Sequence, residues 1–155
     1  MTENIDPGKV AKIDIGTYEI AVGHANATYG DMLSAQMSYQ YCVATALERG
    51  AVDLEHFNDE VRGNSSVTQH ISKVNVSVDQ ECHDAYPRLR AAKVRIEMED
   101  GSHFHRSVDD PYGSAGNPLP DDALRMKFNS LVRSLTDEIY ASELNELVWK
   151  MHDLN

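Results

Sequence analysis

Histidine and cysteine are the residues of this chain best suited to bind a metal ion, and the 155-residue sequence contains seven and two of them. His103 and His105 are two residues apart in a strand-like segment, so both imidazole rings would project from the same face. Cys82-His83 lies in the preceding polar stretch. A zinc site needs three or four converging ligands, but the sequence has no C-x-x-C, H-x-x-x-H or H-E-x-x-H spacing. We therefore expect solvent-facing histidines and no metal site.

Three further polar motifs predict structure more readily than chemistry. The run G-S-A-G at 113–116 lacks the Lys-Ser/Thr of a phosphate-binding loop and the spacing of a dinucleotide fingerprint, so it predicts a loop. Asp109-Asp110 and Asp121-Asp122 could act as acids or bases. The second pair is explained more simply as a helix start, which the helix dipole makes favourable for carboxylates. Neither cysteine has a histidine at a spacing that identifies a catalytic pair.

Length and composition predict one globular domain over residues 1–155. Hydrophobic residues make up 41% and charged residues 25% of the chain, as in ordinary soluble proteins. The formal net charge of -11 argues against a nucleic-acid partner, which would favour a basic face. Two cysteines without a signal-like N-terminus predict reduced thiols and a cytoplasmic protein. No apolar run approaches the length of a membrane span.

Alternation of apolar and polar residues predicts about four strands. Asp100-Gly101 lies between the last two and predicts a type I′ hairpin turn. These two strands must then be antiparallel, whereas the orientation of the first strand is left open. The strands are expected within Val10–Val22 and at Val74–Val78, Val94–Met98 and His103–Val108.

Helical periodicity is strongest over Met32–Arg49, where Leu33, Met37, Tyr41 and Ala44 form one apolar stripe. Asp31 is expected to cap this helix and Gly50 to end it. A short helical turn is expected at Asp53–Phe57, a short helix at Ser65–Lys73 capped by Ser65 or Ser66, and a polar connection at Gln80–Arg90. The last third is predicted to be helical, with stripes at Leu124, Phe128, Leu131 and Leu135 and, after a Thr136 cap, at Ile139, Leu144, Leu147, Val148 and Met151.

These elements predict an α+β fold, a two-layer sandwich in which helices cover one face of a mainly antiparallel sheet. Their order, together with several local motifs, closely resembles the C-terminal lid domain of the MmgE/PrpD family. The family includes 2-methylcitrate dehydratase, cis-aconitate decarboxylase and iminodisuccinate epimerase. The resemblance is carried by Ile5-Asp6-Pro7 before the first strand, the helix motif Ser38-x-x-Tyr41, the Ala46-Leu47-x-x-Gly50 helix end, the Asp100-Gly101 hairpin and the Asn117-Pro118-Leu119 to Lys127-Phe128 run.

The resemblance implies that the residues needed for activity are divided between two domains. In the family, a larger helical domain precedes the lid and carries most acid–base residues, and a His-Thr-His-Pro-type segment usually lies just before the first strand of the lid. This sequence contains neither, so the resemblance implies a separate helical partner subunit. The implied reactions are dehydration, decarboxylation or isomerisation of a small di- or tricarboxylate, and they need no redox cofactor.

Two hydroxyl side chains are implied as site residues by the same resemblance. Tyr41 matches a tyrosine that resembles an active-site residue of the decarboxylase relatives, so its phenol could donate a hydrogen bond to a carboxylate or relay a proton. Ser38, one turn earlier, could offer a second hydroxyl for substrate binding. The alternatives are that Tyr41 belongs to the apolar stripe and that Ser38 is an ordinary helix residue.

An interaction module is the alternative function. A lid that no longer serves an enzyme could present an apolar patch for self-association or for binding another protein. In that case Tyr41 would be a packing residue, whereas a split enzyme predicts no turnover by the isolated chain and turnover by the pair.

Overall fold

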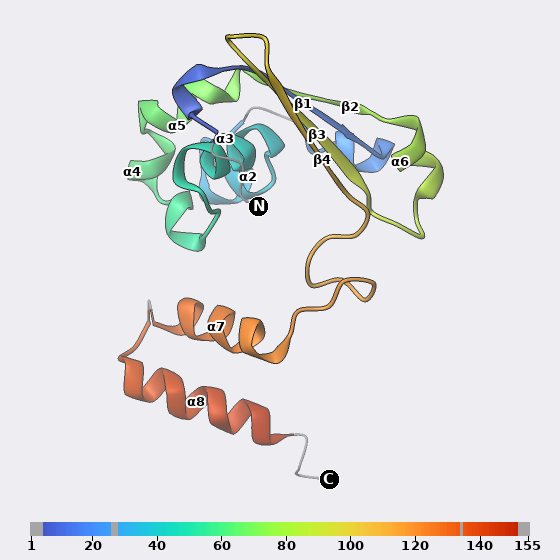
Figure 1. Ribbon diagram of the computed structural model, residues 1–155. Coiled ribbons are helices and arrows are strands. Elements are labelled where there is room, and N and C mark those ends of the chain that lie inside the picture. The colour runs from blue at the N-terminus through green and yellow to red at the C-terminus, as the bar shows by residue number, and fades with distance from the viewer. Residues whose placement is uncertain (1–4, 26–27, 134, 152–155) are drawn as a thin grey trace. The chain divides into compact units, whose positions relative to one another are not determined.

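The computed structural model describes residues 5–25, 28–133 and 135–151. The chain forms two compact units, Met1–Pro111 and Tyr112–Asn155 (Figure 1). The first unit contains the sheet and the second a pair of helices. A single domain over residues 1–155 stays a prediction.

Four strands form one mixed sheet in the first unit, in the order β2-β1-β3-β4. β1 (Val10–Thr17) pairs in parallel with β2 (Val74–Val78) and antiparallel with β3 (Ala92–Met98), which pairs antiparallel with β4 (His103–Val108). Ile13 lies opposite Val74 on one side and Ile96 on the other. The predicted α+β class with a mainly antiparallel sheet of about four strands is confirmed, and the first strand has one neighbour of each orientation.

One face of the sheet carries the core of this layer. Val10, Ile13 and Ile15 are buried together with Val74 and Met98. Val43 and Leu47 of α3 (Tyr39–Arg49) pack against this cluster, so α3 covers that face. Because apolar and polar residues alternate in β1, the hydrophobic side of this strand faces the helical layer.

The helix predicted over Met32–Arg49 is interrupted. α2 (Met32–Gln36) ends at Met37, and α3 begins after Ser38, whose backbone is extended. The Ser38 hydroxyl accepts a hydrogen bond from the backbone N–H of Tyr41 and so caps α3. The prediction of one continuous helix was wrong because serine competes for backbone hydrogen bonds and favours helix starts over interiors. The predicted cap at Asp31 and left-handed end at Gly50 are confirmed.

Short helices connect the strands of the first unit. Asn64 caps α5, in place of the predicted Ser65 or Ser66. The expected polar connection after β2 contains a helix, because Asp79 accepts a hydrogen bond from the backbone N–H of Cys82 and caps it. These elements are η1 (Pro7–Lys9), α1 (Glu19–Val22), η2 (Leu54–Phe57), α4 (Asp59–Arg62), α5 (Ser65–Ile71) and α6 (Gln80–Ala85).

The turn between β3 and β4 is a hairpin, but the predicted type I′ geometry was wrong. Type I′ requires positive φ at both central residues, and only Gly101 has a positive φ, of 83°. Its N–H donates to the Met98 carbonyl at 3.0 Å, and the Met98 N–H donates to the Ser102 carbonyl at 2.9 Å. This pattern is a type I turn followed by a glycine bulge. The Asp100 carboxylate accepts a hydrogen bond from the Ser102 N–H, and the backbone of Asp100 is not left-handed.

An ion-pair cluster joins β3 to the start of α6. The Lys93 ammonium lies 2.9 Å from the Asp79 carboxylate and also bonds to Glu81. The hydrogen bond from Lys93, together with that from the Cys82 N–H, holds the pKa of Asp79 below its ordinary value. The ionised Asp79 carboxylate thus links β3 to the start of α6 through charge-assisted hydrogen bonds.

The second unit is a hairpin of α7 (Asp121–Val132) and α8 (Glu138–Lys150). Asn145 is buried and donates a hydrogen bond to the Asn129 side chain at 2.8 Å. Arg125 bonds to Glu146 at 2.7 Å and lies over the Trp149 ring at 4.5 Å from its centre. The predicted cap at Thr136 was wrong: Asp137 caps α8 through the Tyr140 N–H, one residue later.

Candidate functional site

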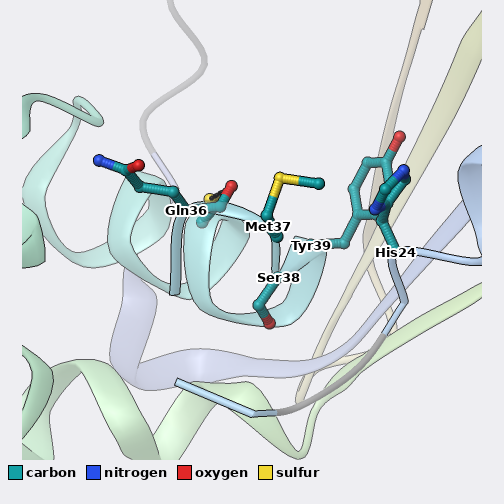
Figure 2. Close-up of a pocket in the computed structure, with 6 residues that line it drawn as sticks. His24, Gln36, Met37, Ser38 and Tyr39 are labelled. Atoms are coloured by element: carbon teal, nitrogen blue, oxygen red, sulfur yellow. Dashed lines mark hydrogen bonds between the residues drawn. The ribbon is translucent and has the colours of Figure 1, made fainter. Parts of the chain in front are cut away.

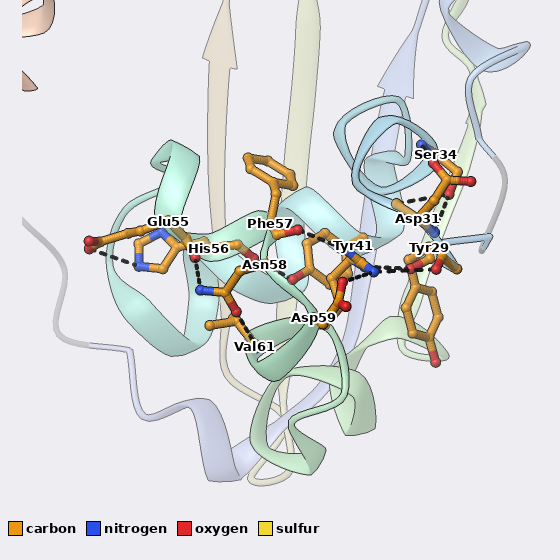
Figure 3. Close-up of polar contacts among 12 residues, drawn as sticks. Tyr29, Asp31, Ser34, Tyr41, Glu55, His56, Phe57, Asn58, Asp59 and Val61 are labelled. Carbon is orange, nitrogen blue, oxygen red and sulfur yellow. Dashed lines mark hydrogen bonds and ion pairs between the residues drawn. The ribbon is translucent and has the colours of Figure 1, made fainter. Parts of the chain in front are cut away.

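Tyr41 lies in the core of the helical layer and has no exposed surface. Its hydroxyl donates a 2.6 Å hydrogen bond to the backbone carbonyl of His56 (Figure 3). Its ring stacks on Tyr29 and contacts Phe57 at centroid distances of 5.7 and 5.8 Å. Burial raises the pKa of the phenol. These contacts are those of a packing residue, the alternative left open above, and catalysis by Tyr41 stays a prediction.

Ser38 is also buried, and its hydroxyl serves as the N-cap of α3. The 3.2 Å hydrogen bond from the Tyr41 N–H links the two predicted site residues through the backbone, so their side chains do not form a pair of free hydroxyls. Substrate binding by Ser38 stays a prediction. Its observed role is to set the point at which the chain turns from α2 into α3.

Arg62, which the sequence did not single out, organises the loops around this core. Its guanidinium donates to the backbone carbonyls of Tyr29, Phe57 and Gly30, at 3.1, 2.8 and 3.3 Å. It also bonds to the Asp59 carboxylate at 2.6 Å. One side chain thereby fixes segments that flank both aromatic neighbours of Tyr41. Only its position in the last turn of a short capped helix could have drawn attention to it.

A hollow of about 280 Å³ opens beside the break between α2 and α3. Tyr39 and His24 both line it, and Figure 2 draws their side chains toward the same end. The Met37 side chain extends on the same side of the helix as the Tyr39 ring, whereas the Ser38 hydroxyl points the opposite way. The lining residues are His24, Gln36, Met37, Ser38, Tyr39 and Cys42.

Burial raises the pKa of two side chains in the wall of the hollow. Desolvation raises the pKa of the Tyr39 phenol, with a further contribution from Tyr18, and it also raises the pKa of the Cys42 thiol. The thiol lies 3.6 Å from the Ala35 carbonyl as a weak hydrogen-bond donor. At neutral pH both groups are therefore protonated, which suits Tyr39 to hydrogen-bond donation and makes Cys42 a poor nucleophile.

Metal binding finds no support in the described part of the chain. Among residues 5–25, 28–133 and 135–151, no group of three or more His, Cys, Asp or Glu side chains is arranged to hold a metal ion. His103 and His105 are exposed on β4, opposite Glu97 and Arg95 of β3. In the same ranges, no helix has the length and apolar character needed to cross a membrane.

Comparison with known proteins agrees with this arrangement of elements. The chain matches the MmgE/PrpD C-terminal domain over residues 1–153, and it belongs to the MmgE/PrpD family. It is 32% identical over 118 residues to a cis-aconitate decarboxylase of Aspergillus terreus, covering 75% of this chain and 24% of that protein. A second cis-aconitate decarboxylase, from Aspergillus terreus strain NIH 2624 / FGSC A1156, is 31% identical over 124 residues, with coverage of 79% and 25%. The chain thus spans about a quarter of the length of these relatives.

Proposed function

We propose that this chain is the lid of an MmgE/PrpD-type enzyme acting on a small di- or tricarboxylate, and that it functions with a separate helical subunit. The observation that carries the proposal is the family match over nearly the whole chain. Two matched relatives are cis-aconitate decarboxylases, so decarboxylation of a cis-aconitate-like acid is the first reaction to test. The matched segments are about a quarter of each relative.

The chemistry of the class fits a lid that supplies shape and hydrogen bonds. Dehydration, decarboxylation and isomerisation all move charge beside a carboxylate, and each requires placed proton donors and acceptors. A lid that closes over the substrate excludes water and strengthens these interactions. The Ser38 hydroxyl caps α3 through the Tyr41 N–H at the helix break that borders the hollow, and Tyr39 presents a protonated phenol in its wall.

Co-expression with a helical-domain member of the same family encoded beside this chain tests the proposal. We expect a stable stoichiometric complex by affinity co-purification and light scattering. The complex should release CO₂ from cis-aconitate or convert a related tricarboxylate, whereas each subunit alone should not. A complex assembled with unrelated helical protein of similar charge is the control. Full turnover by the purified chain alone, or failure to bind the helical subunit, would contradict the split-enzyme proposal.

An interaction module is the second candidate, and a specific observation favours it. α8 exposes Ile139, Leu147 and Met151 to 74%, 64% and 64% of their full surface. Apolar side chains at this exposure favour association with another apolar surface. In the same light-scattering experiment, dimerisation of this chain without binding to the helical subunit would support the interaction module over the enzyme.

A further inference from the structure

Tyr39 carries the hydroxyl that is available beside the break between α2 and α3. It lies two residues before Tyr41, the tyrosine of the family motif. Tyr41 directs its hydroxyl into the core, where the His56 carbonyl accepts it. Tyr39 is half-buried in the wall of the hollow. Among the described residues, none forms a hydrogen bond with its hydroxyl. The phenol is therefore free to donate to a molecule in the hollow.

His24 is held beside Tyr39 by the backbone. The Tyr39 N–H donates to the His24 carbonyl at 3.5 Å, a contact that ties the loop after α1 to the first residue of α3. Both residues line the hollow, and Figure 2 draws their side chains toward the same end of it. The His24 side chain is exposed, so one of its ring nitrogens can donate to the same molecule. The hollow is thus lined by two possible donors from segments 15 residues apart.

No carboxylate in the lining of the hollow would repel an anion. The chain has 25 Asp and Glu residues, yet none of the residues that line the hollow is acidic. The Gln36 amide adds a third possible donor, and Met37 supplies an apolar wall for a short hydrocarbon backbone. A volume of about 280 Å³ lies just below the usual range for ligand pockets, which suits a small molecule over a peptide.

We propose that this hollow binds a carboxylate group of a small organic acid, with the Tyr39 hydroxyl and the His24 ring N–H as its donors. The proposal rests on the proposed function for the choice of acid and assigns the lid's ligand-facing hydroxyl to Tyr39 in place of Tyr41. Because this chain alone forms the hollow, binding does not require the partner subunit. Tyr39 and His24 are binding residues in this proposal, and the reacting atoms are left to the assembled enzyme.

Titration of the full chain, labelled with ¹⁵N, tests the proposal by NMR with citrate as the probe. Propane-1,2,3-tricarboxamide, which has a similar skeleton but no charge, is the control ligand. We expect saturable shifts centred on the amides of residues 36–42 with citrate and not with the amide. Tyr39→Phe should weaken citrate binding about tenfold, the usual effect of losing a hydrogen bond to a charged group. His24→Ala should weaken it similarly, and Tyr112→Phe, which removes an exposed hydroxyl in the second unit, should leave it unchanged.

Three outcomes would overturn the proposal: no saturable shift with citrate, shifts centred elsewhere, or equal binding of citrate and the uncharged amide. The last outcome would show that the hollow does not select a negatively charged ligand. Turnover by the assembled complex is measured separately. A complex that turns over while Tyr39→Phe changes neither binding nor KM would refute this inference and leave the proposed function standing.

Discussion

Replacing Tyr41 by phenylalanine tests whether its hydroxyl belongs to the core or to a substrate. The change removes one oxygen and keeps the ring, so the contacts with Tyr29 and Phe57 remain. What is lost is the 2.6 Å hydrogen bond to the His56 carbonyl in a site without solvent exposure. Loss of a buried hydrogen bond with one partner left behind costs about 1–2 kcal/mol.

That loss should be measurable in both chemical and thermal unfolding. For a unit of about 110 residues, 1–2 kcal/mol corresponds to a decrease in Tm of roughly 4–8 °C. Urea unfolding followed by far-UV circular dichroism should show a lower midpoint with an unchanged slope. Tyr41→Ala, which also removes the ring, should cost more, about 3–5 kcal/mol.

Tyr112→Phe is the matched control, because Tyr112 is 63% exposed and its hydroxyl should contribute less than about 0.5 kcal/mol. If Tyr41→Phe unfolded at the wild-type midpoint, the hydroxyl would not be held in the core. In that case Tyr41 would again be the better candidate for contact with a substrate, and the assignment to Tyr39 would lose its main argument.

Two further predictions concern the ion pairs. Asp79→Asn should destabilise the first unit by about 1 kcal/mol at neutral pH. Because the pKa of Asp79 is lowered in the folded state, its contribution is present above the unfolded-state pKa and disappears as pH falls through the folded pKa. Urea midpoints of wild type and variant should therefore converge in acid, and a constant difference across this range would contradict the ion-pair explanation. Arg125→Ala should destabilise the helix hairpin by about 1 kcal/mol and shift the emission of Trp149, the only tryptophan of the chain. Arg125→Lys, which keeps the charge beside Glu146 but not the planar stacking, should give an intermediate result, and unchanged emission in both variants would refute the stacking.

The sequence predicted the fold well because hydrophobic alternation and turn residues are local signals. The strands at Val74–Val78 and His103–Val108 were placed correctly on that basis. The interruption at Ser38 was missed because the apolar stripe continues through it, and periodicity does not register a serine that turns its hydroxyl to the backbone. The hairpin type was missed because an Asp-Gly pair fits both a type I′ turn and a type I turn with a glycine bulge. In the second arrangement the Asp100 carboxylate accepts a hydrogen bond from the Ser102 N–H.

The candidate site was less predictable than the fold. The motif drew attention to Ser38 and Tyr41, which the structure uses as a cap and a core residue. Tyr39 and His24 belong to no common pattern, because their proximity depends on how the loop after α1 returns to α3. Arg62 was missed for a similar reason, since three of its acceptors are backbone carbonyls, which a sequence does not distinguish.

The parallel pairing of β1 with β2 has a consequence for how the first unit folds. β3 and β4 can form early as a hairpin, since only a short turn separates them. β1 and β2 are separated by residues 18–73, which contain α1 to α5, so their pairing must close a long loop. Contacts of such long sequence separation slow folding. Since Ile13 is paired with both Val74 and Ile96, completing the pairing of β1 requires closure of this long loop as well as the contact with β3.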